Sequence, residues 1–252
     1  MKIISWNVNG LRAAERKGFL QWLESENPDI LGVQELKAKE NQLSTELVSP
    51  KNYFAYFNPA QRMGYSGTAI YTKVEPKKIL NGFGLEEFDI EGRVQMADFG
   101  DFIFFNIYFP NGKKNIQRLE YKLDFYDAAL EYFDKLVRSG KKLIITGDYN
   151  TAHKEIDLAR PKENETISGF LEVERKWLDQ LVEHGYIDCF RKFNENPHEY
   201  TWWSMRSGAR QRNVGWRIDY FFCSKNMEDR VKNCYHLPNV MGSDHCPVVL
   251  EI

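Results

Sequence analysis

A carboxylate and an imidazole stand side by side in the stretch Gly242-Ser243-Asp244-His245-Cys246-Pro247, directly before the apolar run Val248-Val249-Leu250. The apolar run predicts a β-strand, which places Asp244 and His245 on the loop that leads into it. Catalytic residues concentrate on loops that a rigid scaffold positions. An adjacent Asp–His pair is just as typical of an ordinary surface loop, so its meaning depends on whether polar residues also occupy the ends of other strands.

The composition is typical of a soluble globular protein. The chain has 252 residues, of which 42% are hydrophobic and 28% are charged, and this length predicts one large domain spanning residues 1–252. No apolar run approaches the roughly 20 residues of a membrane span, and the N-terminal segment predicts a first strand rather than a signal peptide. The four cysteines are well separated and form no Cys-x-x-Cys pair, which predicts a reduced, cytoplasmic protein without disulfides or a zinc site.

The charge balance restricts how a nucleic acid could be bound. The formal net charge is -2, so a nucleic-acid partner would need a local basic surface. There are two candidates. One is a segment without acidic residues that contains Arg206, Arg210, Arg212 and Arg217. The other is a shorter cluster of Lys113, Lys114 and Arg118. Runs of basic residues are equally typical of a solvated face, and only the flanking residues separate the two interpretations.

Short predicted strands alternate with helices along the chain. Strands are predicted at residues 3–8, 30–33, 53–57, 67–72, 94–99, 102–108, 142–146, 215–222 and 248–250, and helices at 16–26, 118–138 and 173–184, while 200–203 is either strand or loop. The turn Gly100-Asp101 predicts a hairpin between two of the strands. Because some connections are hairpins and others are long crossovers, the pattern favours an α/β protein with mixed sheets, two of them packed together.

Polar side chains recur at or just past the ends of these strands. They are Asn7, Glu35, Tyr108, Asn111, Asp148, Asn150, Asp219, Asp244 and His245. If those ends share one rim, the resulting site is rich in oxygen and holds a single imidazole, which favours Mg²⁺ or Mn²⁺ over zinc. The chain has no Gly-x-x-x-x-Gly-Lys or Gly-x-Gly-x-x-Gly motif. Metal-dependent hydrolysis of a phosphodiester is the reaction that such a site fits.

Six segments contain these residues in chain order. They are Trp6-Asn7-Val8-Asn9-Gly10-Leu11-Arg12, Gln34-Glu35, Tyr108-x-Pro110-Asn111, Gly147-Asp148-Tyr149-Asn150, Asn213-Val214-Gly215-Trp216-Arg217-Ile218-Asp219-Tyr220 and Gly242-Ser243-Asp244-His245-Cys246-Pro247. Together they resemble the motif series of the exonuclease III family of apurinic/apyrimidinic endonucleases, prokaryotic type. The resemblance implies the four-layer α/β sandwich of the endonuclease/exonuclease/phosphatase superfamily, with two packed mixed β-sheets flanked by helices.

The resemblance also implies an activity. Members are Mg²⁺-dependent DNA repair endonucleases of base excision repair, which cut 5′ of abasic sites in double-stranded DNA and leave a 3′-hydroxyl and a 5′-deoxyribose phosphate. Many add 3′→5′ exonuclease and 3′-phosphodiesterase activities. Whether deaminated bases are incised directly stays open, and Lys122, which we expect near the DNA face, makes the question relevant.

The resemblance assigns a metal site. Glu35 would be the principal carboxylate ligand of Mg²⁺, for which Mn²⁺ could substitute, and further residues would surround the metal or the scissile phosphate. These are Asn7, Asp148, Asn150, Asp244 and His245. Asn9 stands where some relatives have aspartate, so no metal-binding role is assigned to it.

The resemblance assigns catalytic roles as well. Asp148 would activate the attacking water, which Asn150 would orient. His245, aligned by Asp219, would contact the phosphate and stabilise its developing charge. Tyr108 and Asn111 would contact the phosphate near the leaving oxygen.

A second group of residues would bind DNA. Its members are Asn111, Lys114, Arg118, Trp202, Arg206, Arg210, Arg212 and Trp216. Trp202 and Trp216 could form a small apolar pocket that accepts a sugar without a base, although packing in the core is the alternative for both. The arginines would bind backbone phosphates, in a contribution to affinity that depends on salt.

Two other functions remain open at this point. The same scaffold could be a phosphatase acting on an inositol phosphate or another small phosphoester, and the basic segment could belong to a non-catalytic nucleic-acid-binding module. The tryptophan–arginine segment favours DNA over a small phosphoester, and the clustered acids with His245 disfavour a pure binding module. We expect a monomer that acts on double-stranded DNA with abasic or damaged sites.

Overall fold

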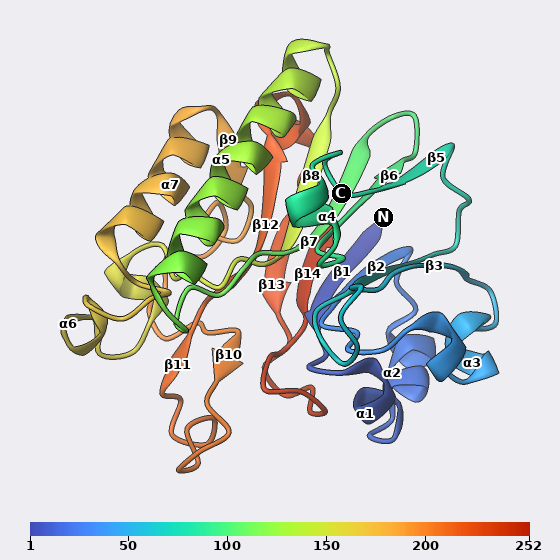
Figure 1. The fold of residues 1–252 in the computed structure, drawn as a ribbon, viewed down its shortest axis with the longest axis horizontal. Coiled ribbons are helices and arrows are strands. Elements are labelled where there is room, and N and C mark those ends of the chain that lie inside the picture. Colours follow the sequence, from blue (N-terminus) through green and yellow to red (C-terminus); the bar gives the residue numbers. More distant parts are fainter.

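The computed structural model describes residues 1–252, and its strands form two six-stranded sheets and a two-stranded ribbon (Figure 1). The strands are β1 (Lys2–Asn7), β2 (Ile30–Gln34), β3 (Phe54–Asn58), β4 (Thr68–Thr72), β5 (Lys78–Asn81), β6 (Val94–Asp98), β7 (Ile103–Tyr108), β8 (Leu143–Asp148), β9 (Tyr186–Asp188), β10 (Trp202–Trp203), β11 (Gly215–Trp216), β12 (Asp219–Ser224), β13 (Asn233–His236) and β14 (Val248–Glu251).

Both large sheets are mixed. The first has the order β13-β14-β1-β2-β4-β3 and the second β5-β6-β7-β8-β12-β9. Each contains one parallel pair, β1 with β2 and β7 with β8, while the other neighbours run antiparallel. The hairpin between β6 and β7 and the terminal strand β14 confirm two predictions made from the sequence.

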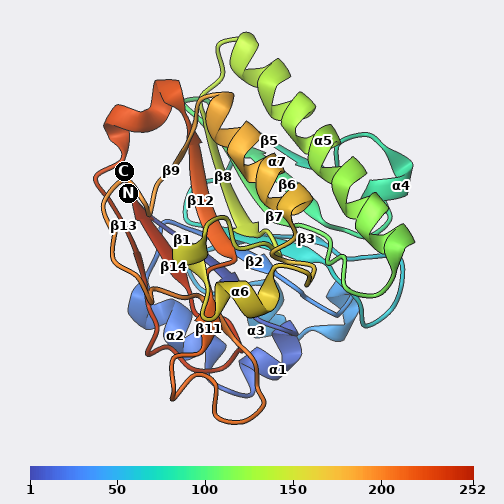
Figure 2. The same ribbon diagram turned by 90° about the vertical axis from the view of Figure 1, so that its left-hand side faces the viewer.

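The helices flank the paired sheets. They are α1 (Leu11–Glu15), α2 (Phe19–Glu26), α3 (Thr45–Val48), α4 (Glu86–Asp89), α5 (Ile116–Arg138), α6 (Pro161–Asn164) and α7 (Glu172–Glu183), with short 3-10 turns η1 (Glu40–Gln42), η2 (Glu155–Asp157) and η3 (Lys225–Arg230). Helices α5 and α7 lie on the outer face of the second sheet, and α1 and α2 lie on the side of the first (Figure 2).

Alternation along the strands builds three apolar layers. Ile3 and Phe104 belong to the core between the two sheets. The adjacent Ile4 packs instead with the residues of α1 and α2, and Phe105 packs with those of α5 and α7. Because successive strand residues point to opposite faces, each central strand must be apolar throughout. The four-layer sandwich is therefore confirmed.

Helix α5 shows why the sequence folds this way locally. The side chain of Asn115 accepts a hydrogen bond from the Arg118 N–H at 2.9 Å, which caps the helix at its first turn. Phe125, Tyr126 and Phe133 then recur on the buried face. The helix begins two residues earlier than predicted because the cap lies at Asn115.

Two predicted elements are wrong in their extent. The helix expected over residues 16–26 begins only at Phe19, because Gly18 has a φ of 94° that no helical residue adopts. The short helix α1 before it was not predicted. The strand expected over residues 215–222 is broken between β11 and β12 at Arg217 and Ile218. There the buried Arg217 side chain pairs with Asp157 and Asp188, outside any ladder.

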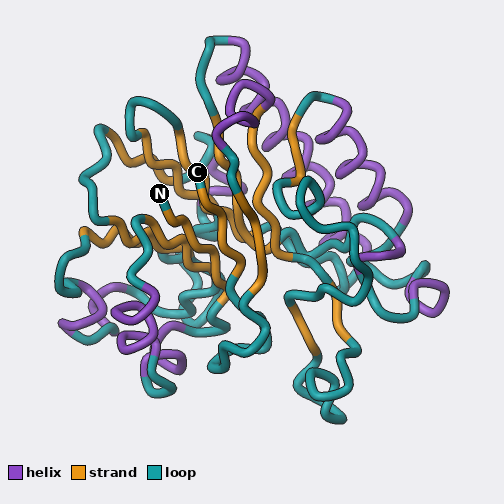
Figure 3. Tube along the Cα trace, turned by 180° about the vertical axis from the view of Figure 1, so that it is seen from behind, coloured by secondary structure: helices purple, strands orange, loops and turns teal.

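The ribbon of β10 and β11 extends from the body of the molecule together with the loop that joins its strands (Figure 3). In its register Trp202 is the direct partner of Trp216. All four cysteines are free and buried, in agreement with the sequence. No helix is long and apolar enough to cross a membrane.

Candidate active site

The site lies where strands of both sheets end at one rim. Asn7 and Gln34 are register partners at the ends of β1 and β2, and Glu35 follows directly. Glu35 has a φ of 58°, so the chain turns sharply there. In the second sheet, Tyr108 pairs with Asp148, and Asp148 pairs with Asp219. Strand register therefore brings together the residues that the sequence predicted at separate strand ends.

Asn7 joins the two sheets across this rim. Its Nδ2 donates to Glu35 Oε1 at 2.9 Å and to Asp148 Oδ2 at 2.8 Å, while its Oδ1 accepts from the Asn9 N–H at 3.0 Å. In this arrangement the amide nitrogen, not the oxygen, faces the carboxylates. Asn7 therefore holds the two acids together, and service as a metal ligand would require its amide to turn over.

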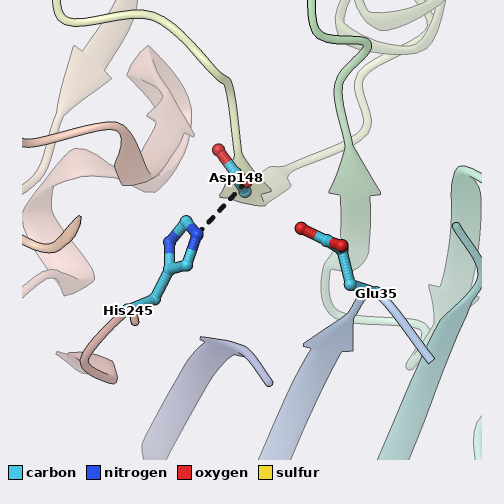
Figure 4. Close-up of side chains that lie close together, drawn as sticks. All are labelled: Glu35, Asp148 and His245. Atoms are coloured by element: carbon cyan, nitrogen blue, oxygen red, sulfur yellow. Dashed lines mark ion pairs between the residues drawn. The ribbon is translucent and has the colours of Figure 1, made fainter. Parts of the chain in front are cut away.

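Glu35, Asp148 and His245 point toward one another from three different segments (Figure 4). One possible ligand atom from each lies within 4.8 Å of the others. Two carboxylates and one imidazole form a donor set that a hard divalent cation accepts. The two carboxylates thus fit a metal ion at this point, whereas the imidazole could join them only in its neutral form.

His245 is held by a short chain of hydrogen bonds. Its Nδ1 lies 2.9 Å from Asp219 Oδ2, and the same oxygen accepts from Thr201 Oγ1 at 2.6 Å. Burial alone would lower the pKa of the imidazole, but Asp219 and Asp148 raise it to about 10. His245 is therefore a buried cation whose Nε2 faces Asp148 at 3.8 Å.

Asp148 carries a perturbed carboxyl group. Burial raises its pKa to about 7, with further contributions from Asp219 and Glu35, and His245 opposes the rise. The Asn150 N–H donates to Asp148 Oδ1 at 2.8 Å. Asn150 in turn accepts from Asn111 Nδ2 at 2.9 Å. A carboxyl group with a pKa near neutrality is suited to accept a proton during a reaction.

Asp244 lies beside Glu35, Asp148 and His245 and is not part of that cluster. Its carboxylate accepts from Asn9 Nδ2 at 2.9 Å and from Trp202 Nε1 at 3.0 Å. Burial opposes ionisation, yet His245 and these donors hold the pKa of Asp244 below its usual value. Asp244 thus fixes the position of the Trp202 ring.

Trp202 and Trp216 form one wall of a cavity at the site. Trp202 and Trp216 meet edge to face with ring centroids 6.4 Å apart. A cavity of about 140 Å³ is lined by both rings together with Glu35, Tyr108, Asn111, Lys113, Asp148, Asn150, Gly169, Ile218, Asp244 and His245. The ammonium of Lys113 lies 5.5 Å from the Trp202 ring centroid and 5.4 Å from that of Trp216. The sequence places Lys113 only in a basic cluster, because no local pattern distinguishes it from Lys114.

The remaining basic residues occupy different environments. Lys114 and Arg118 line a separate groove of about 650 Å³, which shares Asn111 and Lys113 with the cavity. Arg206 and Arg212 are exposed on the loop between β10 and β11. Arg210 is engaged within the chain, where it donates to the carbonyls of Ser243, Pro238 and Val240.

Two basic residues are not at the surface, contrary to the sequence-based expectation. Lys122 is fully buried and pairs with Glu174 at 2.6 Å, so it lies behind the site and not on a surface that DNA could contact. Its ammonium also donates to the Asn150 carbonyl at 2.9 Å, which supports the turn after β8. Arg217 is equally buried, held by Asp157 and Asp188, and is not part of a basic surface.

The chain matches known proteins over nearly its full length. A model of the Endonuclease/Exonuclease/phosphatase family matches residues 4–245. An exodeoxyribonuclease of Bacillus subtilis is 43% identical over 254 residues, covering 100% of this chain and 99% of the relative. A DNA-(apurinic or apyrimidinic site) endonuclease of Dictyostelium discoideum is 41% identical over 251 residues, covering 98% of this chain and 69% of the relative.

A solved structure agrees in fold. An AP endonuclease from Archaeoglobus fulgidus has a TM-score of 0.90 at 28% identity, covering 99% of this chain and 98% of that chain. Family model, sequence relatives and solved structure thus agree on the family and the fold. The chain belongs to the endonuclease/exonuclease/phosphatase family and is a hydrolytic nuclease.

Proposed function

We propose that this nuclease is a Mg²⁺-dependent DNA repair endonuclease that hydrolyses the phosphodiester 5′ of an abasic site in double-stranded DNA. Its products would be a 3′-hydroxyl and a 5′-deoxyribose phosphate. One observation carries the proposal: the cavity that contains Glu35, Asp148 and His245 is also walled by Trp202 and Trp216. The Dictyostelium relative, named as an endonuclease of apurinic or apyrimidinic sites, supports this substrate.

The size of the cavity favours a small group. Its volume of about 140 Å³ is well below the roughly 300–1,000 Å³ typical of sites for drug-sized ligands. A sugar that has lost its base is unstacked, so turning it out of the duplex costs little. The aromatic walls would receive this sugar and exclude one that still has a base.

The ionisable residues supply the proton transfers. Asp148, with a carboxyl pKa raised to about 7, would take a proton from the attacking water. His245, kept positive by Asp219, would stabilise the charge that develops on the phosphate. Tyr108 and Asn111 line the same cavity and would contact the phosphate near the leaving oxygen.

Glu35 would be the principal ligand of the metal, together with Asp148. His245, as a cation, would lie beside the metal toward the phosphate and not bind the metal itself. When bound, Mg²⁺ would neutralise phosphate charge and favour ionisation of the attacking water, and Mn²⁺ could substitute. Asn7 supports this arrangement because it holds both carboxylates at hydrogen-bond distance. We include Asn150 and Asp244 as supporting residues at the edge of the metal site.

The basic groove beside the cavity would hold the DNA backbone. Lys113, Lys114 and Arg118 line the groove, and Arg206 and Arg212 lie exposed on the neighbouring loop. Phosphate contacts of this kind give affinity without reading sequence and weaken with salt. We propose that the protein acts as a cytoplasmic monomer with a single domain of residues 1–252.

Exonuclease activity is proposed as an additional property. The Bacillus relative is named an exodeoxyribonuclease, and 3′→5′ exonuclease and 3′-phosphodiesterase activities require the same hydrolysis at a strand end. The alternative, a phosphatase for a small phosphoester, is less well supported because a basic groove adjoins the cavity.

The test is cleavage of a duplex containing one abasic analogue, with Mg²⁺ or with EDTA. The matched substrates are the intact duplex, a duplex with a 3′-phosphate and inositol phosphate. The proposal predicts one cut 5′ of the abasic position, only with Mg²⁺. Release of phosphate from inositol phosphate, with no cleavage of the abasic duplex, would favour the phosphatase instead.

A further inference from the structure

Arg93 lies directly behind Tyr108, one of the residues that line the cavity. The Tyr108 N–H donates to the Arg93 carbonyl at 2.8 Å, and Arg93 Nη1 donates to the Tyr108 carbonyl at 2.8 Å. The guanidinium carbon of Arg93 is 4.6 Å from the centroid of the Tyr108 ring. One arginine therefore contacts both the backbone and the ring of Tyr108.

The other two nitrogens of the Arg93 guanidinium also donate to protein groups. Nε donates to Glu91 Oε2 at 2.5 Å, and Nη2 donates to the Tyr65 hydroxyl at 2.8 Å. The residue is only 2% exposed. Arg93 is thus enclosed, so any influence on a reaction must pass through the residues it contacts, and of these Tyr108 lines the cavity.

The side chains that Arg93 contacts also accept hydrogen bonds from Arg118. Arg118 donates to both carboxylate oxygens of Glu91, at 2.8 and 2.5 Å, and to the Tyr65 hydroxyl at 2.9 Å. Glu91 would therefore keep a cationic partner if Arg93 were replaced. Replacement of Arg93 therefore does not leave the buried Glu91 carboxylate without a cationic partner.

Tyr108 is sensitive to a neighbouring cation. Burial raises the pKa of its phenol well above the usual value, the Glu35 and Asp148 carboxylates raise it further, and Arg93 lowers it. A cation over the face of an aromatic ring is attracted to it and so restrains the ring. Arg93 therefore restrains the ring of Tyr108 as well as its backbone.

We infer that Arg93 is a positioning residue for the nuclease reaction, which holds the Tyr108 phenol toward the scissile phosphate without touching the substrate. The inference rests on the proposed function, because that function assigns Tyr108 to the phosphate. It predicts that loss of Arg93 lowers the rate of cleavage and leaves DNA affinity unchanged, since the guanidinium is not part of the groove surface.

The experiment is a double-mutant cycle on an abasic duplex with Mg²⁺. Single-turnover rates are measured for wild type, Arg93→Met, Tyr108→Phe and the double variant, and the Kd for DNA is measured in EDTA. Arg93→Met should slow cleavage about 10- to 100-fold, as a displaced group near the reacting atoms does. In the Tyr108→Phe background the same change should cost less than about threefold, because the phenol through which it acts is absent.

Two further variants sharpen the comparison. Arg93→Lys keeps a cation beside the ring and should restore most of the lost rate. Arg230→Met is the matched control, since Arg230 also pairs with a carboxylate, Asp101, and lies over an aromatic ring, Phe102, but at the opposite end of β7. It should cleave at the wild-type rate.

The outcomes separate the inference from the function on which it rests. Equal losses from Arg93→Met in both backgrounds, or a loss confined to Kd, would overturn the positioning role. Arg93→Gln, which also removes the charge, replaces the methionine variant if that variant does not fold. A wild-type protein that fails to cut the abasic duplex would contradict the proposed function instead.

Discussion

Asp219 and Asp148 are direct partners across the antiparallel strands β12 and β8, and His245 lies between their carboxylates. Nδ1 of the imidazole is 2.9 Å from Asp219 Oδ2, and Nε2 is 3.8 Å from Asp148 Oδ2. A shift of one residue in this register would turn one carboxylate to the opposite face of the sheet. The charge state of the site therefore depends on the pairing of two strands that are distant in sequence.

The contact between Asp219 and His245 leads to the first prediction. Asp219→Asn should lower the pKa of His245 from about 10, because burial favours the neutral imidazole and Asp219 is the leading group that opposes it. Cleavage should slow roughly 10²–10⁴-fold. The pKa is measured by NMR titration of the imidazole in the metal-free protein. Asp179→Asn is the control, since Asp179 pairs with a different histidine, His153. An unchanged His245 pKa would remove Asp219 from its orienting role.

Glu35 tests the metal site. Glu35→Ala should weaken divalent cation binding and slow turnover by orders of magnitude, because hard cations require carboxylate ligands. Duplex binding in EDTA should change little. Mn²⁺ binding followed by electron paramagnetic resonance provides a readout independent of activity. Glu24→Ala, on α2, serves as the control acid. Unaltered Mn²⁺ affinity in the Glu35 variant would place the metal elsewhere.

The tryptophan pair tests substrate selection. Trp216→Ala should reduce the preference for abasic over intact duplex, because a widened cavity no longer excludes a base. The measurement is cleavage of matched duplexes across a salt series. Arg212→Ala is the matched comparison: it should weaken both duplexes alike and reduce the salt dependence of binding. If the abasic preference of Trp216→Ala equals that of wild type, selectivity arises outside the cavity.

Asp157 tests the buried ion network beneath Trp216. Its Oδ1 is 2.7 Å from Arg217 Nε and 2.6 Å from Arg191 Nη2. Burial opposes ionisation, but the two arginines hold the carboxyl pKa well below its usual range. Removal of one partner from a buried pair typically costs about 3–5 kcal/mol, so Asp157→Asn should lower the free energy of unfolding by about this amount at neutral pH.

The pH dependence of this effect has a defined sign. Because the folded-state pKa lies below the unfolded value, the contribution is fully present above about pH 4 and declines as pH falls further. Urea unfolding at neutral pH and near pH 3 should therefore show a smaller difference between wild type and Asp157→Asn in acid. A difference that stays constant would exclude Asp157 as the source.

The local patterns in the sequence were sufficient for much of the fold and for the rim of the site. Apolar runs ending in Asn7, Asp148 and Tyr108 marked strand ends, and the Gly100-Asp101 turn marked the hairpin. What joins two sheets at one rim is long-range pairing, such as that of Asp148 with Asp219, and local patterns do not encode it.

The errors concern charges whose partners lie far away in sequence. Lys122 and Arg217 resemble surface residues until Glu174, Asp157 and Asp188 are seen to neutralise them in the interior. A buried charge requires such a partner, but its sequence neighbours do not reveal it.

In the proposed function, the site around Asp148 performs the hydrolysis. The most direct test is the single-turnover rate of Asp148→Asn on an abasic duplex with saturating Mg²⁺, alongside its Kd for the same duplex in EDTA. Asparagine keeps the size of the side chain and removes the base, so we expect a loss of roughly 10²–10⁴-fold in rate with near-normal DNA binding. Cleavage at the wild-type rate would contradict it.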